Sequence, residues 1–180
     1  GRIGCFPNEA APLAKEITEQ NILKLAGTIT HFAVSDSITT ENQEFTKKQY
    51  NDFVQAIENI KKEGINPGIR TCSSSAALFA FPEMQMDMVR PGIVIYGYYP
   101  DEITKDFLKN KGIDVDLKPV MQLETSVVAI KKITKGTSIS YGRTWIAQND
   151  TTIAVLPIGY ADGLLRRSSS GLKVTINGKI

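Results

Sequence analysis

Helical and strand-like segments alternate along the first half of the chain, and this alternation constrains the fold more than any other feature. Apolar residues at helical spacing predict a first helix around Ala10–Ile17, which Gly27 closes, and a second helix over 40–64. A capping box at Thr40–Gln43 opens the second helix, and a glycine ends it. Two helices separated by a short strand-like run are typical of an α/β protein.

Three apolar runs predict strands: 28–34, 67–77, which runs into a serine cluster, and 87–97. They are largely apolar rather than alternating, as expected of parallel strands that are covered on both faces. The first part of the chain, 1–111, is therefore predicted to form βαβ units around a parallel sheet.

After about residue 111 the helical periodicity disappears. Closely spaced strand-like runs with Gly and Asn-Asp turns predict an all-β domain over 112–180. Asn177-Gly178 follows an alternating run and predicts a hairpin turn whose return strand would begin at Lys179. Because a hairpin with one arm leaves a ladder unpaired, we expect the chain to be a segment of a longer protein.

Composition excludes several classes of partner. The 180 residues carry a net charge of only +2 and no basic block, which argues against nucleic acid and membrane surfaces. The apolar runs are too short to span a bilayer. Two distant cysteines, Cys5 and Cys72, predict reduced thiols in a cytoplasmic protein rather than a disulfide framework.

Residues at three predicted strand ends carry candidate chemistry, because functional groups collect at the C-terminal ends of strands in parallel barrels. His31 is the only histidine, and the serines of 71–77 precede small residues that begin a helix, as in many anion sites. Arg90 interrupts an apolar run, and Gly92 permits close backbone approach. Each also has an ordinary structural interpretation: a packed histidine, a helix cap or a surface arginine.

Six motifs together resemble one family. In order, the chain reads GRIG, THFAVSD, TCSSSAA, DMVRPGIVIYG, SYGRTW and PIGYADG. The series is similar to bacterial alanine racemase, a pyridoxal-phosphate enzyme with an N-terminal (β/α)8 barrel and a C-terminal β domain. The resemblance implies the second half of the barrel over 1–111 and the first part of the β domain over 112–180.

The resemblance also implies roles for residues at matching positions. Ser74 and Ser75, with the backbone of Gly92 and Ile93, would bind the cofactor phosphate. Arg90 would face the cofactor's pyridine nitrogen. Other positions would act on the reaction or the substrate, namely His31 in a network with Arg90, Tyr141 as the catalytic tyrosine, Arg2 at the substrate carboxylate and Tyr160 near the substrate entrance.

The chain departs from the family pattern at Thr71 and Ser74, where the family usually has histidine and asparagine. The family's Schiff-base lysine would precede this chain, so none of the present lysines receives that role and the segment alone is expected to be inactive. The implied protein is a cytoplasmic homodimer with shared active sites that makes D-alanine for the cell wall, and no metal is expected.

Two alternatives remain open at this point. A serine or serine/alanine racemase of the glycopeptide-resistance type shares the architecture, and a non-catalytic pyridoxal-phosphate barrel protein shares the first domain. The SYGRTW and GYADG motifs speak against the second alternative, because they belong to the β domain that such proteins lack.

Overall fold

The computed structural model describes residues 3–179, except for the side chains of Ser169 and Ser170. The chain divides into two compact units, Gly1–Met121 and Gln122–Ile180, called here the first and the second unit. The predicted assignment of 1–111 to a cofactor-binding half-barrel and 112–180 to a β domain stays a prediction at this boundary.

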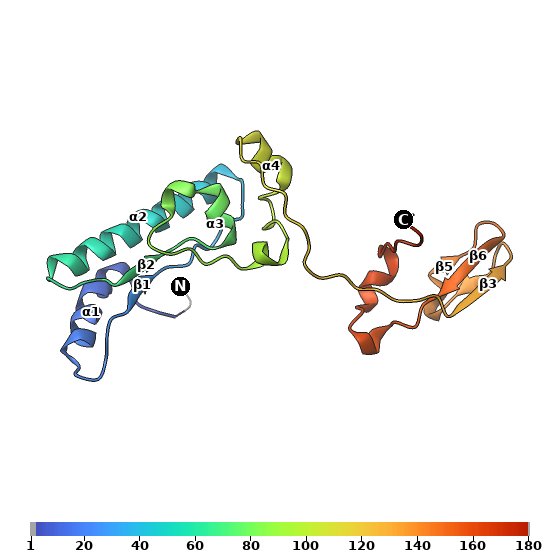
Figure 1. Ribbon diagram of the computed structural model, residues 1–180, viewed down its shortest axis with the longest axis horizontal. Coiled ribbons are helices and arrows are strands. Elements are labelled where there is room, and N and C mark those ends of the chain that lie inside the picture. Colours follow the sequence, from blue (N-terminus) through green and yellow to red (C-terminus); the bar gives the residue numbers. More distant parts are fainter. Residues whose placement is uncertain (1–2, 180) are drawn as a thin grey trace. The chain divides into compact units, whose positions relative to one another are not determined.

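The first unit is built around a parallel βαβ motif (Figure 1). Gly27 of β1 lies opposite Ile69 of β2, and Ile29 lies opposite Thr71. The two strands are joined through the long helix α2, as the alternation predicts. The elements of this unit are α1 Ala10–Glu19, β1 Gly27–Ile29, α2 Thr40–Lys62, β2 Ile69–Thr71, α3 Ser75–Ala80 and α4 Lys105–Asn110, with 3-10 turns at Pro7–Glu9, Pro82–Met84 and Ile93–Tyr96.

Two helix boundaries differ from the predictions. The cap of α2 is Thr39, whose hydroxyl accepts a hydrogen bond from the Asn42 N–H, one position before the predicted box. The first helix ends at Glu19, and Gly27 begins β1 instead of closing that helix. The reason is tertiary: a Cβ at Gly27 would lie 2.5 Å from the Ile69 carbonyl oxygen, so glycine is required where the strands approach.

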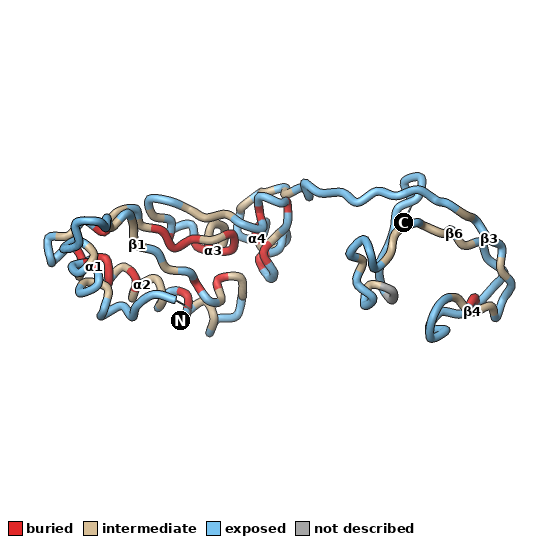
Figure 2. Tube along the Cα trace, turned by 90° about the horizontal axis from the view of Figure 1, so that it is seen from below, coloured by how far each residue is buried: buried red, intermediate tan, exposed pale blue. Residues whose placement is uncertain are grey.

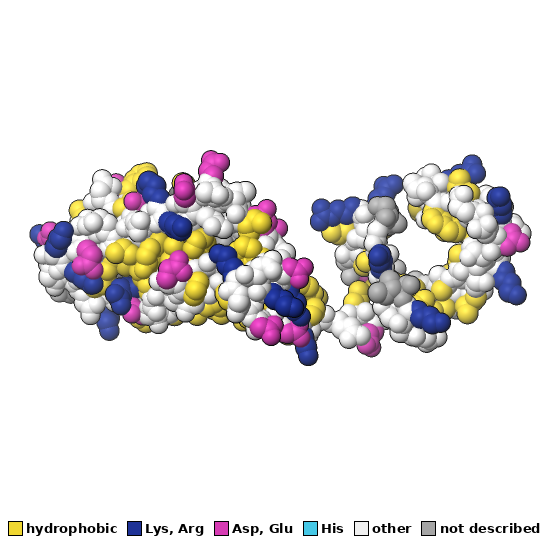
Figure 3. Space-filling view, turned by 90° about the horizontal axis from the view of Figure 1, so that it is seen from above, with side chains coloured by type: hydrophobic (Ala, Val, Ile, Leu, Met, Phe, Trp, Pro, Cys, Tyr) yellow, Lys and Arg dark blue, Asp and Glu magenta, His cyan; other side chains and the backbone are white. Residues whose placement is uncertain are grey.

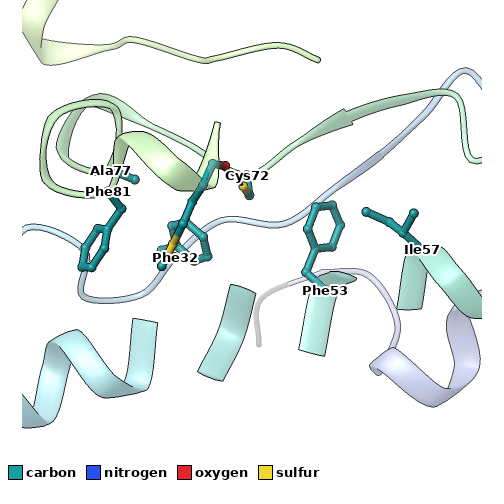
Figure 4. Packing of buried hydrophobic residues seen from close by; sticks show 7 residues of the cluster. Phe32, Phe53, Ile57, Cys72, Ala77 and Phe81 are labelled. Atoms are coloured by element: carbon teal, nitrogen blue, oxygen red, sulfur yellow. Dashed lines mark hydrogen bonds between the residues drawn. The ribbon is translucent and has the colours of Figure 1, made fainter. Parts of the chain in front are cut away.

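The core of the first unit lies between α2 and the β2–α3 segment, as the buried stretches in Figure 2 show. α2 contributes Phe53 and Ile57, while the chain after β1 contributes Phe32. These side chains meet those of the β2–α3 segment in Figure 4. The whole cluster comprises Phe32, Phe53, Ile57, Cys72, Ala77, Phe81 and Met84.

The strand predicted over 87–97 is not formed. This segment makes a single parallel bridge, Ser74 to Arg90, and then turns into the 3-10 helix Ile93–Tyr96. Two backbone bonds remain, from the Asp87 N–H to the Arg70 carbonyl and from the Arg90 N–H to the Ser73 carbonyl. Side chains supply the other contacts: the Asp87 carboxylate accepts the Arg70 backbone N–H, and the Thr71 hydroxyl donates to the Met88 carbonyl. Pro91, which has no N–H, follows at once and stops further pairing.

A tight crossing holds the last part of the first unit against the 3-10 turn. The Val120 N–H donates to the Tyr96 carbonyl at 3.2 Å, and the Tyr99 hydroxyl donates to the Val115 carbonyl at 2.6 Å. Gly97 lies under this crossing with φ of +83°, and a Cβ there would lie 1.8 Å from the Lys118 carbonyl oxygen.

The second unit consists of short antiparallel pairs. β3 Ala129–Ile133 pairs with β6 Thr151–Val155, and β4 Ser138–Ile139 pairs with β5 Trp145–Ile146. Three 3-10 turns, Tyr141–Arg143, Tyr160–Asp162 and Arg166–Ser170, complete it. The predicted strands are therefore present but shorter than the sequence runs.

The predicted Asn177-Gly178 turn is confirmed. Ile176 and Lys179 exchange backbone hydrogen bonds of 2.8 and 3.0 Å, and both turn residues have positive φ, 50° and 76°. Those two angles are what a two-residue hairpin of the favoured twist requires.

Apolar surface remains exposed in both units. Among the side chains described in 122–179, only Ala147 is buried, so the second unit has almost no core of its own. On the first unit, hydrophobic side chains gather in a band across the face seen in Figure 3. None of the helices in 3–179 combines the length and apolar character that crossing a membrane requires.

We predict that Gly97→Ala detaches the crossing segment, because it adds a clash with backbone to the left-handed strain. Gly112→Ala is the matched control, since its φ of +76° is similar but a Cβ there would meet nothing within 4 Å. The control should lose only about 1–2 kcal/mol. Amide hydrogen exchange at Val120 should accelerate at least roughly tenfold in Gly97→Ala alone. Equal effects of the two variants would contradict the crossing's role.

Candidate functional site

An open pocket of about 320 Å³ lies at the C-terminal ends of β1 and β2. His31 follows β1, and the start of α3, which follows β2, supplies Ser74 and Ser75. The segment after Met88 supplies Arg90 and Gly92 to the same wall. Five predicted site residues from three separate segments therefore come together here, where parallel α/β folds commonly carry their chemistry.

Arg90 spans the ends of both strands. Its Nη1 donates to Thr71 Oγ1 at 2.6 Å, and its Nη2 donates to the Thr30 carbonyl at 2.8 Å. Nη2 also lies 3.4 Å from His31 Nδ1. Because a guanidinium only donates, Nδ1 is the acceptor wherever this contact is a hydrogen bond. The predicted link between His31 and Arg90 is thus present.

The charge of Arg90 is not matched by an acid. Within 3–179, Arg90 forms no ion pair with a carboxylate, whereas nearby Arg70 is paired with Asp87. Partial burial lowers the pKa of the Arg90 guanidinium from its ordinary value, since desolvation disfavours the charged form. The group still stays protonated near neutral pH. A half-buried cation at the wall of a pocket, held only by neutral acceptors, favours an electron-rich ligand.

Thr71, one of the two positions that depart from the family pattern, supports Arg90 from behind. It is the last residue of β2 and is buried, and its hydroxyl lies directly behind the guanidinium. A threonine therefore provides the acceptor at the position where the family usually has a histidine.

Ser74, Ser75 and Gly92 lie together beside Arg90 in the pocket wall. The Gly92 N–H donates to Ser75 Oγ at 2.8 Å, which joins the segment after Arg90 to the start of α3. Within 3–179 the Ser75 hydroxyl hydrogen has no protein acceptor, so it is available to an anion in the pocket. Ser74 is the N-cap of α3 and makes no side-chain capping bond. Ile93 begins the 3-10 turn and is half exposed.

A bidentate ion pair holds the segment that carries Arg90. Arg70 Nε and Nη2 donate to the two Asp87 oxygens at 2.7 and 2.6 Å. The Arg70 backbone N–H also donates to the Asp87 carboxylate, and the Asp87 N–H donates to the Arg70 carbonyl. Arg70 lowers the pKa of the Asp87 carboxyl to about 2, mainly through its side-chain hydrogen bonds. This pair fixes the path of the chain three residues before Arg90.

Tyr141 lies in a strained turn of the second unit. It joins β4 to β5, and the neighbouring residues Ser140, Gly142 and Arg143 have φ of 63°, 74° and 50°. Ser140, with ψ of −175°, occupies a region that is essentially reserved for glycine. Tyr141 itself is 89% exposed. Strain of this kind concentrates at functional sites, which supports a role for the turn.

Two further residues were predicted for the site, Tyr160 and Arg2. Tyr160 begins a 3-10 turn in the second unit and is exposed. Arg2 lies outside the described residues. The pocket lining described in 3–179 comes entirely from the first unit.

Sequence reasoning did not assign Thr30, Thr71 or Asp87 to the site. Thr30 contributes only a backbone carbonyl, which no side-chain pattern signals. The contacts of Thr71 and Asp87 depend on how the 87–90 segment aligns with β2. Thr71 bonds Met88 and Asp87 bonds Arg70, each 17 positions away. Two acidic residues, Glu83 and Asp87, lie between Arg70 and Arg90, and nothing in the sequence marks Asp87 as the ion-pair partner.

Two family models match the chain. The model described as alanine racemase, N-terminal domain, matches residues 1–100, and the model described as alanine racemase, C-terminal domain, matches 120–180. The chain belongs to the alanine racemase family. The resemblance that the six motifs carry is thereby confirmed.

Relatives within the family are close but much longer. The alanine racemase of Treponema denticola is 53% identical over 175 residues, which are 97% of this chain and 44% of that protein. The alanine racemase of Clostridium novyi is 43% identical over 182 residues, 100% of this chain and 44% of that protein. The chain thus spans about 44% of the length of these curated relatives.

Solved alanine racemases share the fold. The Clostridium difficile enzyme in complex with cycloserine matches 91% of this chain and 41% of its own, with a TM-score of 0.76 and 33% identity. The Bacillus anthracis enzyme with bound L-Ala-P matches 93% and 42%, with a TM-score of 0.74 and 34% identity. These matches confirm the predicted fold class, part of a (β/α)8 barrel followed by part of an all-β domain.

The lowered pKa of Asp87 predicts how the stability of this chain depends on pH. The folded pKa of about 2 lies below the ordinary value of 3.8, so the ion pair stabilises the fold above about pH 4 and is lost as pH falls through 2. Asp87→Asn should lower the melting temperature at pH 7, and the difference from the wild type should disappear between pH 4 and 2. Circular dichroism melts measure this.

Asp114→Asn is the control for the pH experiment, because Asp114 is exposed and makes no hydrogen bond within 3–179. Its melting temperature should follow the wild type across the range. A difference for Asp87→Asn that persists unchanged at pH 2 would show that the ion pair is not the cause.

We predict that Ser140→Gly relieves the strain beside Tyr141. The strained conformation costs about 1–3 kcal/mol, while glycine adds about 0.5–1 kcal/mol of chain entropy. The net gain of about 1 kcal/mol should slow amide exchange at Ala147, whose N–H bonds the Thr137 carbonyl across the hairpin, roughly fivefold. Ser126→Gly, in an exposed segment, is the control and should not slow it. Faster exchange in Ser140→Gly would refute the strain.

Proposed function

We propose that these 180 residues belong to a pyridoxal-phosphate-dependent alanine racemase that interconverts L-alanine and D-alanine. The observation that carries the proposal is the half-buried Arg90, which is held by neutral acceptors, has no acid partner in 3–179 and lies beside serine hydroxyls in one pocket. The alanine racemase names of the relatives support the choice of substrate.

The pocket residues fit the cofactor. Of the five N–H donors of Arg90, the Nε–H and one Nη1–H have no acceptor in 3–179, which leaves them for a ring nitrogen. The available Ser75 hydroxyl, the Ser74 hydroxyl and the backbone N–H of Ile93 would hold the phosphate, while the Gly92 N–H, which donates to Ser75 Oγ, would position that hydroxyl. When bound, the cofactor supplies an electron sink that makes the α-proton of an amino acid acidic.

Arg90 would control how strongly that sink acts. A guanidinium donates a hydrogen bond but keeps its proton, so it orients the ring without protonating it. This restraint favours return of the proton to Cα over transfer of the amino group. His31 would help by accepting from Nη2 and fixing the guanidinium on that side.

Tyr141 would exchange a proton with the substrate Cα on one face. A tyrosine is a weak base at neutral pH, so this role requires positive charge nearby. Racemisation needs a second base on the opposite face, for which the family uses its cofactor-binding lysine. Arg2 would bind the substrate carboxylate, since a guanidinium fork matches a carboxylate, and Tyr160 would line the entrance.

The same proposal places the protein in the cytoplasm as a homodimer that supplies D-alanine for peptidoglycan. The two free cysteines, Cys5 exposed and Cys72 buried, are consistent with a reducing compartment. The match of 120–180 to the racemase C-terminal domain argues against a single-barrel carrier.

The test is an assay of the complete protein that contains this segment. Purified enzyme with cofactor should convert L-alanine to D-alanine, read by chiral chromatography, and should act at least roughly tenfold less well on L-serine. Incorporation of solvent deuterium at the Cα of alanine, measured in D2O, provides a second readout. Comparable or faster turnover of L-serine would establish the serine alternative, and cofactor binding without turnover of either would establish the carrier.

A chimera controls for the rest of the protein. The matching 175 residues of the Treponema denticola alanine racemase can be exchanged for this segment, since the two are 53% identical. The chimera should racemise alanine, and Arg90→Leu in the chimera should abolish it. Activity that survives Arg90→Leu would overturn the observation on which the proposal rests.

A further inference from the structure

Thr71 makes two short hydrogen bonds with one oxygen. Its Oγ1 lies 2.6 Å from Arg90 Nη1 and 2.6 Å from the Met88 carbonyl oxygen. A guanidinium can only donate and a carbonyl can only accept, so the direction of both bonds is determined. The hydroxyl accepts from Arg90 and donates to Met88.

The position of this hydroxyl is unusually well held. Thr71 is 3% exposed, and its carbonyl accepts the Thr30 N–H at 3.1 Å across the parallel pair. A β-branched side chain has few χ1 rotamers, and both hydroxyl bonds must be satisfied in the same one. The oxygen behind Arg90 is therefore part of the sheet rather than a mobile side-chain end.

Thr71 also holds an end of the guanidinium that nothing else holds within the described residues. Nη2 is shared between the Thr30 carbonyl and His31, whereas Nη1 bonds only Thr71. Without the Thr71 bond, the hydrogen bonds would hold the guanidinium only at Nη2, and its plane would be less constrained on the Nη1 side. Arg90 would then keep its charge but lose part of its orientation.

We propose that Thr71 is a positioning residue: a non-titrating relay from the Met88 carbonyl to Arg90 that sets the guanidinium plane toward the pocket. The orientation itself is a property of the 180-residue chain. Only its consequence for the reaction rests on the function proposed above. Because a hydroxyl does not titrate between pH 5 and 9, the bond from Thr71 to Nη1 keeps the same strength across that range, unlike a contact to a titratable imidazole such as that of His31 at Nη2.

The direct test measures Arg90 in the 180-residue chain without cofactor. Nitrogen-15 NMR follows hydrogen exchange at the Arg90 Nη groups, whose signals are identified by their absence in Arg90→Lys. Thr71→Val, which keeps the shape but removes the hydroxyl, should accelerate this exchange at least roughly tenfold. Thr71→Ser, which keeps the hydroxyl, should restore slow exchange.

Thr46→Val is the matched control. Thr46 is fully buried in α2, and its hydroxyl donates to the Asn42 carbonyl, so this variant removes a buried threonine hydroxyl that does not touch Arg90. It should leave Arg90 exchange unchanged. Unchanged exchange in Thr71→Val, or equal acceleration in Thr46→Val, would overturn the proposal.

If Thr71→Val does not fold, the Thr71 hydroxyl proton of the wild-type chain tests the relay instead. A Thr71 hydroxyl that donates to Met88 should give an observable, slowly exchanging proton signal, whereas a hydroxyl proton averaged with water would refute the relay.

A second arm uses the complete enzyme. Thr71→Val should raise the ratio of amino-group transfer to racemisation several-fold and shift the absorbance of bound cofactor, while Thr71→Ser restores both. A changed ratio that Thr71→Ser does not restore would count against the relay. Absence of cofactor binding in the wild type would reject the proposed function alone, because the cofactor-free exchange experiment stands independently.

Discussion

The interaction on which the site depends is the attachment of one half-buried cation to two strand ends. Arg90 is held by a carbonyl after β1 and a hydroxyl at the end of β2, with no acid partner in 3–179. A carboxylate there would satisfy the cation inside the protein. Neutral acceptors fix its direction instead and leave its charge for whatever enters the pocket.

The rest of the first unit holds these two strand ends in place. The parallel pairing brings Ile29 opposite Thr71, and glycine at position 27 allows the strands to approach. The core between α2 and the β2–α3 segment supports the sheet from one side. The Arg70–Asp87 pair then places the segment that delivers Arg90. Stability and site geometry thus share the same contacts.

The second unit contrasts with the first. It carries the strained turn at Tyr141 but buries almost nothing among its described side chains. Antiparallel pairs form there because local turns such as Asn177-Gly178 suffice to bring the strands together. A packed core needs a sheet of several strands with an apolar face covered by another element, and these short two-stranded pairs do not provide one within the unit.

The sequence by itself determined the features that depend on local chemistry. Apolar spacing predicted α1, α2 and the parallel class of sheet, and the Asn-Gly pair predicted its hairpin. An arginine within an apolar run marked the site. The motif series identified the family, which the family models confirm.

Tertiary structure decided what depends on residues far apart in the chain. The expected strand over 87–97 is reduced to a single bridge, because the side chains of Asp87 and Thr71 take some of the bonds of the ladder and Pro91 has no N–H to donate. Gly27 spaces two strands rather than ending a helix, because Ile69 lies against it. The partners of Arg90 are 19 and 60 positions away, and only the parallel register brings them to one guanidinium.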